Sequence, residues 1–210
     1  MIKDDLSKIN RYFYNENAKD FSLSRANVWD GFLYIKDKYI KNGDNILDIG
    51  CGNGRFAKVL DSSTDYTGVD FSSKLLNIAK HSFPQYKFYL RDVTKEGWYN
   101  NIGLFNVIVA IAMFHHIPED KSRNTFLNDV KKILKKNGIF IFSVWNISNI
   151  EKYKTIKGKK NDYLIPWQNR NSFRYVHKFQ NDEVENYISL SPFQLIEKFQ
   201  FEQNSYFVVS

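Results

Sequence analysis

The sequence predicts an α/β fold in which a mostly parallel seven-stranded sheet carries helices on both faces and ends in an antiparallel strand. The first observation is that short apolar runs alternate with segments of helical periodicity, which indicates parallel strands joined by right-handed crossovers. The second is a glycine-rich loop directly after the first strand. The third is a strand pair without an intervening helix at the end of the chain.

The composition fits a single domain. A chain of 210 residues buries about 70% of its unfolded surface, and no repeat or long linker divides it. No apolar run reaches the ~18 residues of a membrane span, the N-terminus lacks an apolar signal core, and Cys51 is the single cysteine, so we expect a cytoplasmic protein without a membrane partner. The formal net charge of +7 suits a polyanionic partner, although abundant Lys in the composition explains it equally well.

The first part of the chain leads into the glycine loop. Residues 1–20 are polar, and we expect them to be loose. Apolar residues at helical spacing predict a helix over 27–40, which Asn42 and Gly43 end. The apolar run 45–49 reads as a buried parallel strand, and a helix is expected to begin at Phe56.

The remaining elements follow the same alternation. Ser72 is expected to cap the helix after the second strand, and the run 105–112 is apolar enough for a strand buried on both faces. Residues 146–180 are expected to be irregular, basic and aromatic. In order, the expected elements are strand 66–70, helix 72–83, edge strand 86–90, strand 105–112, helix 118–136, strand 139–145, helix 182–190 and a closing strand pair over 193–201 and 205–209.

The glycine loop lies at the carboxyl end of the first strand. Gly50, Gly52 and Gly54 allow sharp turns and a close approach of the backbone to a ligand. A dinucleotide fingerprint needs its third glycine three positions after the second, and that position is Arg55. The pattern Asp-x-Gly-x-Gly-x-Gly, which begins at Asp48, instead resembles the first motif of class I S-adenosylmethionine (SAM) methyltransferases.

Acidic residues follow the next two strands. Asp70 can accept both hydroxyls of a ribose, although it could also cap the helix before Ser72. Asp92 suits the adenine amino group, although aspartate is common in turns. Asp48 is a carboxylate in an apolar strand, where it is costly unless it is paired or faces a cation.

The resemblance implies a Rossmann-like cofactor core with SAM as the donor and S-adenosylhomocysteine as the product. Cys51 is expected to be a small loop residue and not a nucleophile, and the end of the fourth strand should line the methionine moiety. We expect a helical lid at 1–44, the cofactor-binding core at 45–145, a substrate-facing insertion at 146–180 and closing elements at 181–210. The expected cofactor-binding residues are Asp48, Gly50, Cys51, Gly52, Asn53, Gly54, Asp70, Phe71, Asp92, Val93, Ala110 and Ile111.

Segments outside the core carry a second resemblance. Their order and residues resemble the tRNA wobble-uridine methyltransferases that esterify 5-carboxymethyluridine, in which F-S-x-T-R…W, HH, D-x-x-x-P-W and R-Y-Y-H-x-F recur. The matching segments are 21–25 with Trp29, 110–118, 162–167 and 174–179. The resemblance implies that tRNA is the substrate, with Arg25, Trp29, Asp162 and Trp167 as substrate-binding residues.

Methyl transfer to a carboxylate needs no general base, because the acceptor is already ionised at pH 7. It needs donors that hold one oxygen toward the methyl carbon, and His116, Arg174, Tyr175 and His177 are the expected catalytic residues. A hydroxyl or amine acceptor would instead use His116 or His177 as a base. We expect no metal, although His115, His116, His177 and Asp162 could form a metal site.

The sequence leaves two further questions open: whether a Lys-rich segment contacts phosphates, and whether a partner subunit docks on a sheet edge. The Lys-rich segment 151–160 could contact phosphates or be only a solvated loop. Eukaryotic members of the resembled family work with a small zinc-binding activator subunit, and the edge strand 86–90 is a possible docking site for one. The alternatives to a tRNA enzyme are a small-molecule O-, N- or carboxyl methyltransferase and a non-catalytic SAM-binding subunit.

Overall fold

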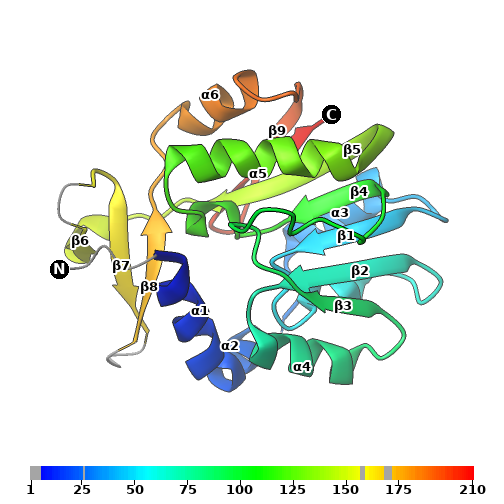
Figure 1. The fold of residues 1–210 in the computed structure, drawn as a ribbon, viewed down its shortest axis with the longest axis horizontal. Coiled ribbons are helices and arrows are strands. Elements are labelled where there is room, and N and C mark those ends of the chain that lie inside the picture. The colour runs from blue at the N-terminus through cyan, green and yellow to red at the C-terminus, as the bar shows by residue number, and fades with distance from the viewer. Residues whose placement is uncertain (1–5, 26, 157–158, 168–171) are drawn as a thin grey trace.

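The computed structural model describes residues 6–25, 27–156, 159–167 and 172–210. Seven strands form one sheet in the order β3-β2-β1-β4-β5-β10-β9, and β10 is antiparallel to both of its neighbours (Figure 1). This confirms the predicted fold class. The strands are β1 (Asn45–Ile49), β2 (Asp65–Asp70), β3 (Lys87–Leu90), β4 (Phe105–Ala110), β5 (Leu134–Trp145), β9 (Leu195–Phe201) and β10 (Asn204–Val209).

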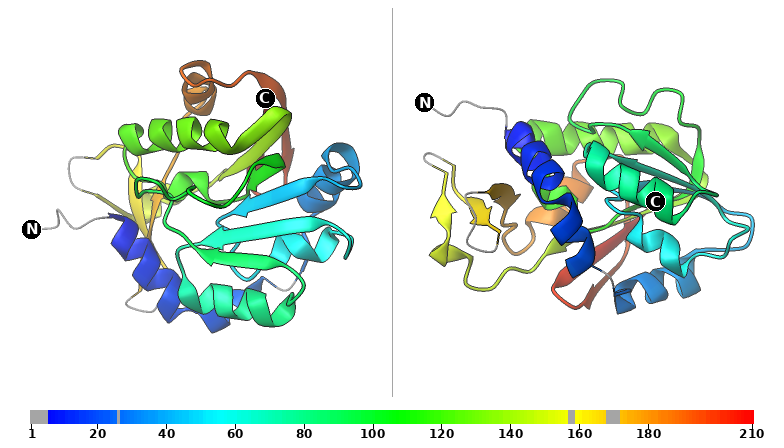
Figure 2. Two further views of the ribbon diagram at one scale, coloured as in Figure 1. Left: turned by 45° about the vertical axis from the view of Figure 1, so that its right-hand side comes forward. Right: turned by 90° about the horizontal axis from the view of Figure 1, so that it is seen from below.

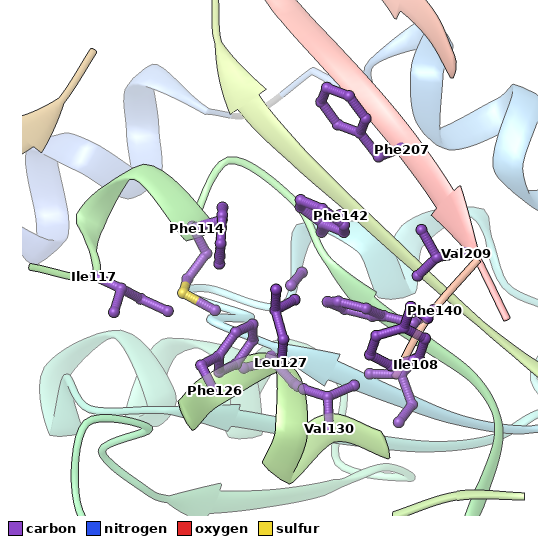
Figure 3. Packing of buried hydrophobic residues seen from close by; sticks show 14 of the residues in the cluster. Ile108, Phe114, Ile117, Phe126, Leu127, Val130, Phe140, Phe142, Phe207 and Val209 are labelled. Carbon is purple, nitrogen blue, oxygen red and sulfur yellow. The ribbon is translucent and has the colours of Figure 1, made fainter. Parts of the chain in front are cut away.

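Helices cover both faces of this sheet. On one face, α5 and α6 pack against apolar side chains of β1, β4, β5 and β10 (Figures 1 and 2). Figure 3 shows how Phe126, Leu127 and Val130 of α5 meet Phe140 and Phe142 of β5. On the other face lie α3, a short 3₁₀ helix η1 and α4. Their bounds are α3 (Asp30–Tyr39), η1 (Arg55–Val59), α4 (Ser73–Ser82), α5 (Asp120–Ile133) and α6 (Glu183–Ser189).

The order of the strands reverses between β1 and β4, which are parallel neighbours that are not consecutive in the chain. In open α/β sheets the carboxyl ends of the strands at such a reversal border the ligand crevice. The glycine loop follows β1 at this place, and residues 111–117 follow β4. The topology therefore brings the two expected halves of the site together.

The expectation that residues 1–20 are loose is wrong for residues 6–20. Two helices, α1 (Leu6–Glu16) and α2 (Ala18–Ser24), lie against the carboxyl ends of the strands. The residues of α1 that are buried are Ser7, Asn10, Phe13 and Tyr14, which share one face of the helix. Polar residues on the buried face hid this periodicity in the sequence.

Residues 146–180 are also not irregular throughout. A second sheet in the order β6-β7-β8 pairs antiparallel strands, and Figure 1 shows α1 beside β8. Its elements are η3 (Ile150–Lys152), β6 (Lys154–Thr155), β7 (Asp162–Pro166) and β8 (Phe173–His177). This small sheet has a core of its own, with Ile150, Tyr163, Ile165 and Val176 buried.

Several expected boundaries shift for local reasons. The expected helix at Phe56 is the 3₁₀ helix η1, and the helix expected over 118–136 is α5, which ends at Ile133 because β5 begins at Leu134. The fourth strand ends at Ala110, because Ala112 has a positive φ of 54°. Among the described residues no helix has the length and apolarity needed to cross a membrane.

Candidate active site

The glycine loop wraps around the carboxyl end of β1. Gly50 and Gly52 have positive φ angles of 73° and 56°, which L side chains rarely adopt. A Cβ on Gly50 would lie 2.6 Å from the Cγ of Met113, so this position is also sterically closed. The loop is thereby held against β2, where the amide of Gly50 donates to the carbonyl of Val69 at 2.8 Å.

Asp70 anchors the loop and faces the pocket. Its carboxylate accepts hydrogen bonds from the amides of Gly52 at 2.9 Å and Ser72 at 2.7 Å. Burial raises the pKa of Asp70 to about 6 although these amides favour the ionised form. Ser72 itself caps α4 by accepting from the amide of Leu75 at 3.2 Å. Asp70 therefore bonds the start of α4, as the helix-capping interpretation predicted. It also lines the pocket, as the ribose-binding interpretation requires.

Asp48 is buried beneath the loop. The hydroxyl of Tyr66 donates to its carboxylate at 2.7 Å. Burial raises the pKa of Asp48 to about 7, against the opposing effect of that hydrogen bond. Nearby Asp70 raises it further, whereas the Arg55 cation lowers it. A cationic ligand in the pocket would supply the charge partner that this carboxylate lacks.

Asp92 is held by an unexpected partner. Its carboxylate accepts from the amide and hydroxyl of Thr94 at 3.0 and 2.7 Å and forms an ion pair with Arg11 of α1. Arg11 lies in the segment that was expected to be loose, so the sequence did not single it out. The ion pair attaches α1 to the segment that follows β3, at the edge of the site.

The remaining expected cofactor residues divide into two groups. Gly54 and Ala110 do not line the pocket; Gly54 instead has positive φ at the start of η1, and Ala110 is fully buried in the core. Burial also raises the pKa of the Cys51 thiol well above its usual value, as expected for a packing residue. The expected cofactor residues that line the pocket are Asp48, Gly50, Cys51, Gly52, Asn53, Asp70, Phe71, Asp92, Val93 and Ile111.

Helices α1 and α2 cover the pocket. The Asn53 side chain of the glycine loop donates to Ser22 at 2.8 Å, and Ser72 donates to Asn15 at 3.0 Å. The guanidinium of Arg55 lies 3.7 Å from the ring centroid of Trp29, just before α3. Contacts from the cofactor loops thus hold both lid helices in place.

His116 is a neutral imidazole in the pocket wall. Its Nδ1 lies 2.8 Å from the carbonyl oxygen of Tyr175, which can only accept, so Nδ1 carries the proton. Its Nε2 then accepts from the hydroxyl of Tyr14 at 2.8 Å. Burial, followed by the Arg174 cation, lowers the pKa of His116 to about 3. Tyr14 is a pocket residue that the sequence reasoning missed.

A second cavity adjoins the cofactor pocket. Arg25, Trp29 and Trp145 line both cavities, so the two share a wall. Arg174 lines the second cavity and is buried at 7% exposure, with its guanidinium 4.4 Å from the ring centroid of Trp145. Its Nε and Nη1 find no hydrogen-bond partner among the described residues. The structure therefore brings Arg25, Trp29 and Arg174 to one cavity.

Tyr175, His177 and Asp162 lie elsewhere. Asp162 accepts from His177 Nδ1 at 2.6 Å and from the Tyr175 hydroxyl at 3.0 Å, and Glu183 contacts His177 Nε2 at 2.8 Å. The Tyr175 hydroxyl also accepts from Arg123 at 3.1 Å. None of Tyr175, His177 and Asp162 is among the lining residues of either cavity. Their hydrogen bonds join β7, β8, α5 and α6, so the geometry suits a role in positioning the small sheet.

Two other aromatic candidates are packed inside the protein. Trp167 is 8% exposed, lies against Phe13 with ring centroids 6.0 Å apart, and lines neither cavity. His115 is fully buried, with its ring centroid 4.6 Å from that of Trp145. Burial lowers the pKa of His115 well below its usual value. Within the described ranges, no three His, Cys, Asp or Glu side chains are grouped as metal ligands would be.

Comparison with known proteins identifies the class to which this site belongs. A family model described as a methyltransferase domain matches residues 23–198. The chain belongs to this family and is a class I enzyme that transfers a methyl group from SAM and releases S-adenosylhomocysteine.

The similar curated proteins include tRNA-modifying enzymes. The chain is 26% identical over 168 residues to the tRNA (carboxymethyluridine(34)-5-O)-methyltransferase of Schizosaccharomyces pombe, covering 77% of this chain and 68% of that protein. It is 27% identical over 151 residues to the enzyme of the same activity name from Macaca fascicularis, covering 70% of this chain but 22% of that protein. A protein of Encephalitozoon cuniculi that is named only as a candidate methyltransferase is 28% identical over 189 residues, covering 88% and 87% of the two chains.

Solved structures show the same fold. The complex of DhpI with SAM and HEP superposes with a TM-score of 0.76 at 15% identity over 100% of both chains. A SAM-dependent methyltransferase from Clostridium acetobutylicum gives a TM-score of 0.68 at 16% identity, covering 94% of this chain and 98% of that one. At these identities the likeness concerns the fold alone.

The residues of the pocket fit SAM. The cofactor carries a sulfonium and an ammonium group, and Asp48 and Asp70 are buried carboxylates at the pocket floor. A Cβ on Gly52 would meet nothing closer than 3.9 Å, so the glycine leaves open space above the loop. When bound, SAM supplies a methyl group that an electron-rich atom can attack. The chain's own contribution is to bind, orient and shield the two reactants.

Proposed function

We propose that this enzyme methylates the carboxylate of 5-carboxymethyluridine at the wobble position of a tRNA. The observation that carries the proposal is Arg174, a buried cation with unpartnered N–H groups in the cavity next to the cofactor pocket. A buried charge without a partner is costly, and an anionic acceptor would satisfy it. Arg174 is a suitable ligand for a carboxylate because its guanidinium donates several N–H bonds in one plane.

A second cation supports an anionic acceptor. Arg25 lines the same cavity, and burial, followed by the charge of Arg174, lowers its pKa. Two guanidinium groups that repel each other at one cavity are each stabilised when an anion binds between them. Glu202 also lines this cavity, but its carboxylate accepts the amide of Asp30 at 2.7 Å and so serves the start of α3.

The site favours an acceptor that needs no deprotonation. His116 is the histidine that contacts the cofactor pocket, and both of its ring nitrogens are hydrogen-bonded within the protein. With a pKa of about 3 it is a weak base at neutral pH. His177, the other expected base, lies outside both cavities with carboxylates on each side. A carboxylate acceptor therefore suits this site better than a hydroxyl or a protonated amine.

In this mechanism the protein acts by positioning and electrostatics. Arg174 would hold one acceptor oxygen, and Trp29 and Trp145 line the same cavity beside it. The lid helices exclude water from the pocket once both reactants are bound. Tyr175, His177 and Asp162 would keep β8, and with it Arg174, in place.

The tRNA assignment draws on relatives and on the outer segments of the sequence. Two relatives act on carboxymethyluridine 34 according to their names, at 26% and 27% identity. In the Lys-rich segment, Lys157 lies outside the described residues, and Lys159 forms an ion pair with Glu119 at 3.0 Å.

The docking site proposed for an activator subunit is strand β3. This strand is an edge of the sheet, and its Leu90 is 55% exposed.

The test is methyl transfer from labelled SAM to tRNA, followed by mass spectrometry of the nucleosides. We expect the methyl ester of carboxymethyluridine to form, and a deletion strain to lack it. Arg174→Lys keeps the charge but loses the planar donor set, and Arg174→Gln loses the charge. Both should lower kcat/KM, the second by at least about 100-fold. Labelling of small acids and not tRNA by the wild-type enzyme would assign the acceptor to a small molecule.

A further inference from the structure

Three aromatic rings lie close to the guanidinium of Arg174. Its central carbon is 4.4 Å from the ring centroid of Trp145 and 5.6 Å from those of Phe13 and Trp167. All three distances are within the ~6 Å over which a ring face attracts a cation. The rings come from separate segments, because Phe13 belongs to α1, Trp145 ends β5 and Trp167 directly follows β7. Segments far apart in the sequence therefore meet at one cation.

Two of these rings lie outside both cavities. Trp145 lines the two cavities, whereas Phe13 and Trp167 line neither. Phe13 is fully buried, and Trp167 is 8% exposed. The indole N–H of Trp167 has no hydrogen-bond partner among the described residues, so this side chain contributes the face of its ring and not a donor. Phe13 and Trp167 can therefore act on the acceptor cavity through Arg174, which lines it.

Hydrogen bonds fix both of these rings relative to β8. On α1, the side chain of Asn10 binds the backbone of Tyr175: its Oδ1 accepts from the amide at 2.7 Å, and its Nδ2 donates to the carbonyl at 3.2 Å. The amide of Trp167 donates to the carbonyl of Ser172 at 3.1 Å, just before β8 begins. Both rings are thus attached to backbone on either side of Arg174.

A ring face holds a cation without neutralising it. A carboxylate partner would occupy the N–H groups of a guanidinium and cancel its charge. An aromatic ring carries no net charge and stacks on the guanidinium plane, so the N–H groups at the edge of that plane remain available. Nε and Nη1 of Arg174 have no hydrogen-bond partner among the described residues. The acidic residue that lines the same cavity, Glu202, accepts instead from the amide of Asp30.

We propose that Phe13 and Trp167 are positioning residues: with Trp145 they form an aromatic cage that fixes the Arg174 guanidinium at the acceptor cavity and leaves its Nε and Nη1 free for an anion. The cage explains how this cation can be buried while two of its N–H sites have no partner in the described part of the chain. It gives Trp167 an indirect role in place of the substrate contact that the sequence predicted. The part of the inference that concerns the acceptor rests on the function proposed above.

The first test does not need an acceptor. Tryptophan analogues with one or several ring fluorines, incorporated at position 167 alone, keep nearly the same shape but attract a cation less strongly. In the protein saturated with S-adenosylhomocysteine, ¹⁵N NMR should show the Nε proton of Arg174 exchanging several-fold faster with water as fluorines are added, with a nearly constant melting temperature. The control is the same series at Trp98, a buried residue that packs against Phe126 of α5. A constant exchange rate across the series at position 167 would overturn the inference.

The second test is kinetic. Trp167→Leu removes the ring and should raise the KM for the acceptor about tenfold, with the Kd of SAM within about twofold of wild type. Trp167→Phe keeps a ring face and should recover most of this loss. Trp98→Leu is the matched control: it also removes a buried indole, so it should lower the melting temperature but leave the KM for the acceptor unchanged. Equal KM values for wild type and Trp167→Leu would contradict the proposal.

A double variant shows whether Trp167 acts through Arg174. In Arg174→Gln the cation is absent, so the addition of Trp167→Leu should change the KM for the acceptor little further. If the losses of the two single variants multiply in the double variant, Trp167 acts by another route and the inference fails.

The outcomes separate this inference from the tRNA proposal. If wild-type enzyme does not methylate tRNA but fluorination at position 167 speeds proton exchange at Arg174, the substrate proposal fails and the cage remains. If tRNA is methylated and the series at position 167 changes neither the exchange rate nor the KM, the inference about the cage fails alone.

Discussion

Gly50 shows how one residue can be required for two separate reasons. Its φ of 73° disfavours any side chain, and a Cβ would also lie 2.6 Å from Met113. Gly43 has a φ of 83° but nothing within 4 Å of its Cβ position. The pair therefore separates backbone strain from steric exclusion.

Gly50→Ala should cost more stability than Gly43→Ala. Both substitutions pay about 1–3 kcal/mol for a left-handed alanine. Gly50→Ala should lose about 1–3 kcal/mol more, because Met113 must be displaced in a packed wall. Denaturant unfolding measures the two values, and calorimetry should show weakened SAM binding for Gly50→Ala only. Equal losses in the two variants would mean that Met113 yields freely.

The pH dependence of SAM binding should report on Asp70. A ligand that offers hydroxyl donors and positive charge prefers the ionised carboxylate, and the pKa of Asp70 is about 6 in the free pocket. Affinity should therefore rise as the pH increases from 5 to 7, by up to about tenfold per unit where the group is protonated. Calorimetry of Asp70→Asn should show weaker binding with a flatter profile. The slope that remains belongs to Asp48, whose pKa is about 7, and Asp48→Asn tests this assignment.

At the scale of elements, the small sheet is attached through a buried ionic network. Asp162 of β7, His177 of β8 and Glu183 of α6 are joined by hydrogen bonds of 2.6 and 2.8 Å. Burial alone would lower the pKa of His177, but the two carboxylates outweigh it and raise the pKa above 6.5. Burial would raise the pKa values of Asp162 and Glu183, but His177 and other donors outweigh it and lower them below 3.8 and 4.5.

This network predicts a pH window of stability. The contribution of His177 is complete below pH 6.5 and is lost as the pH rises through its raised pKa. The contributions of the carboxylates are present above pH 4.5 and are lost as the pH falls through their lowered pKa values. The melting temperature of wild type should therefore exceed that of His177→Gln most between pH 4.5 and 6.5. A difference that is constant from pH 4 to 9 would contradict this assignment.

The elements also show what the sequence could reveal. The strands with near-continuous apolar runs, such as β4, were predictable. A strand that is buried on both faces carries apolar residues at almost every position. Helix α1 was not recognised because its buried face carries Ser7 and Asn10, although Asn10, Phe13 and Tyr14 have helical spacing. The small sheet was missed because polar residues with partners outside their own strand, such as Asp162 and His177, interrupt its strands.

The site was predictable where local geometry decides it. The glycine loop, Asp70 and Asp92 sit at strand ends, and the topology brings these to one edge. Tyr14 and Arg11 reach the site only because α1 packs across that edge, and no short motif signals such packing. Tyr175 and His177 follow Arg174 within three residues but lie outside the cavities, because successive side chains of β8 point to opposite faces of the small sheet.

At the scale of the whole molecule, the net charge of +7 bears on whether the acceptor is a polyanion such as tRNA. If tRNA is the substrate, phosphate contacts should make its KM depend steeply on salt. About four contacts at a single-stranded loop would give a slope of about −3 for log affinity against log salt. The KM for SAM should change little over the same range, because its charges are bound in a buried pocket.

A matched pair of charge reversals locates those contacts. Lys160, just before β7, is exposed at the end of the molecule that carries the small sheet. Lys80 is exposed near the C-terminal end of α4, whereas the pocket residues of that segment lie at its N-terminal end. Lys160→Glu should raise the KM for tRNA several-fold and reduce the salt slope by about 1. Lys80→Glu changes the net charge equally and should leave both unchanged; equal effects of the two variants would show that tRNA is attracted by the overall charge and not by a defined face.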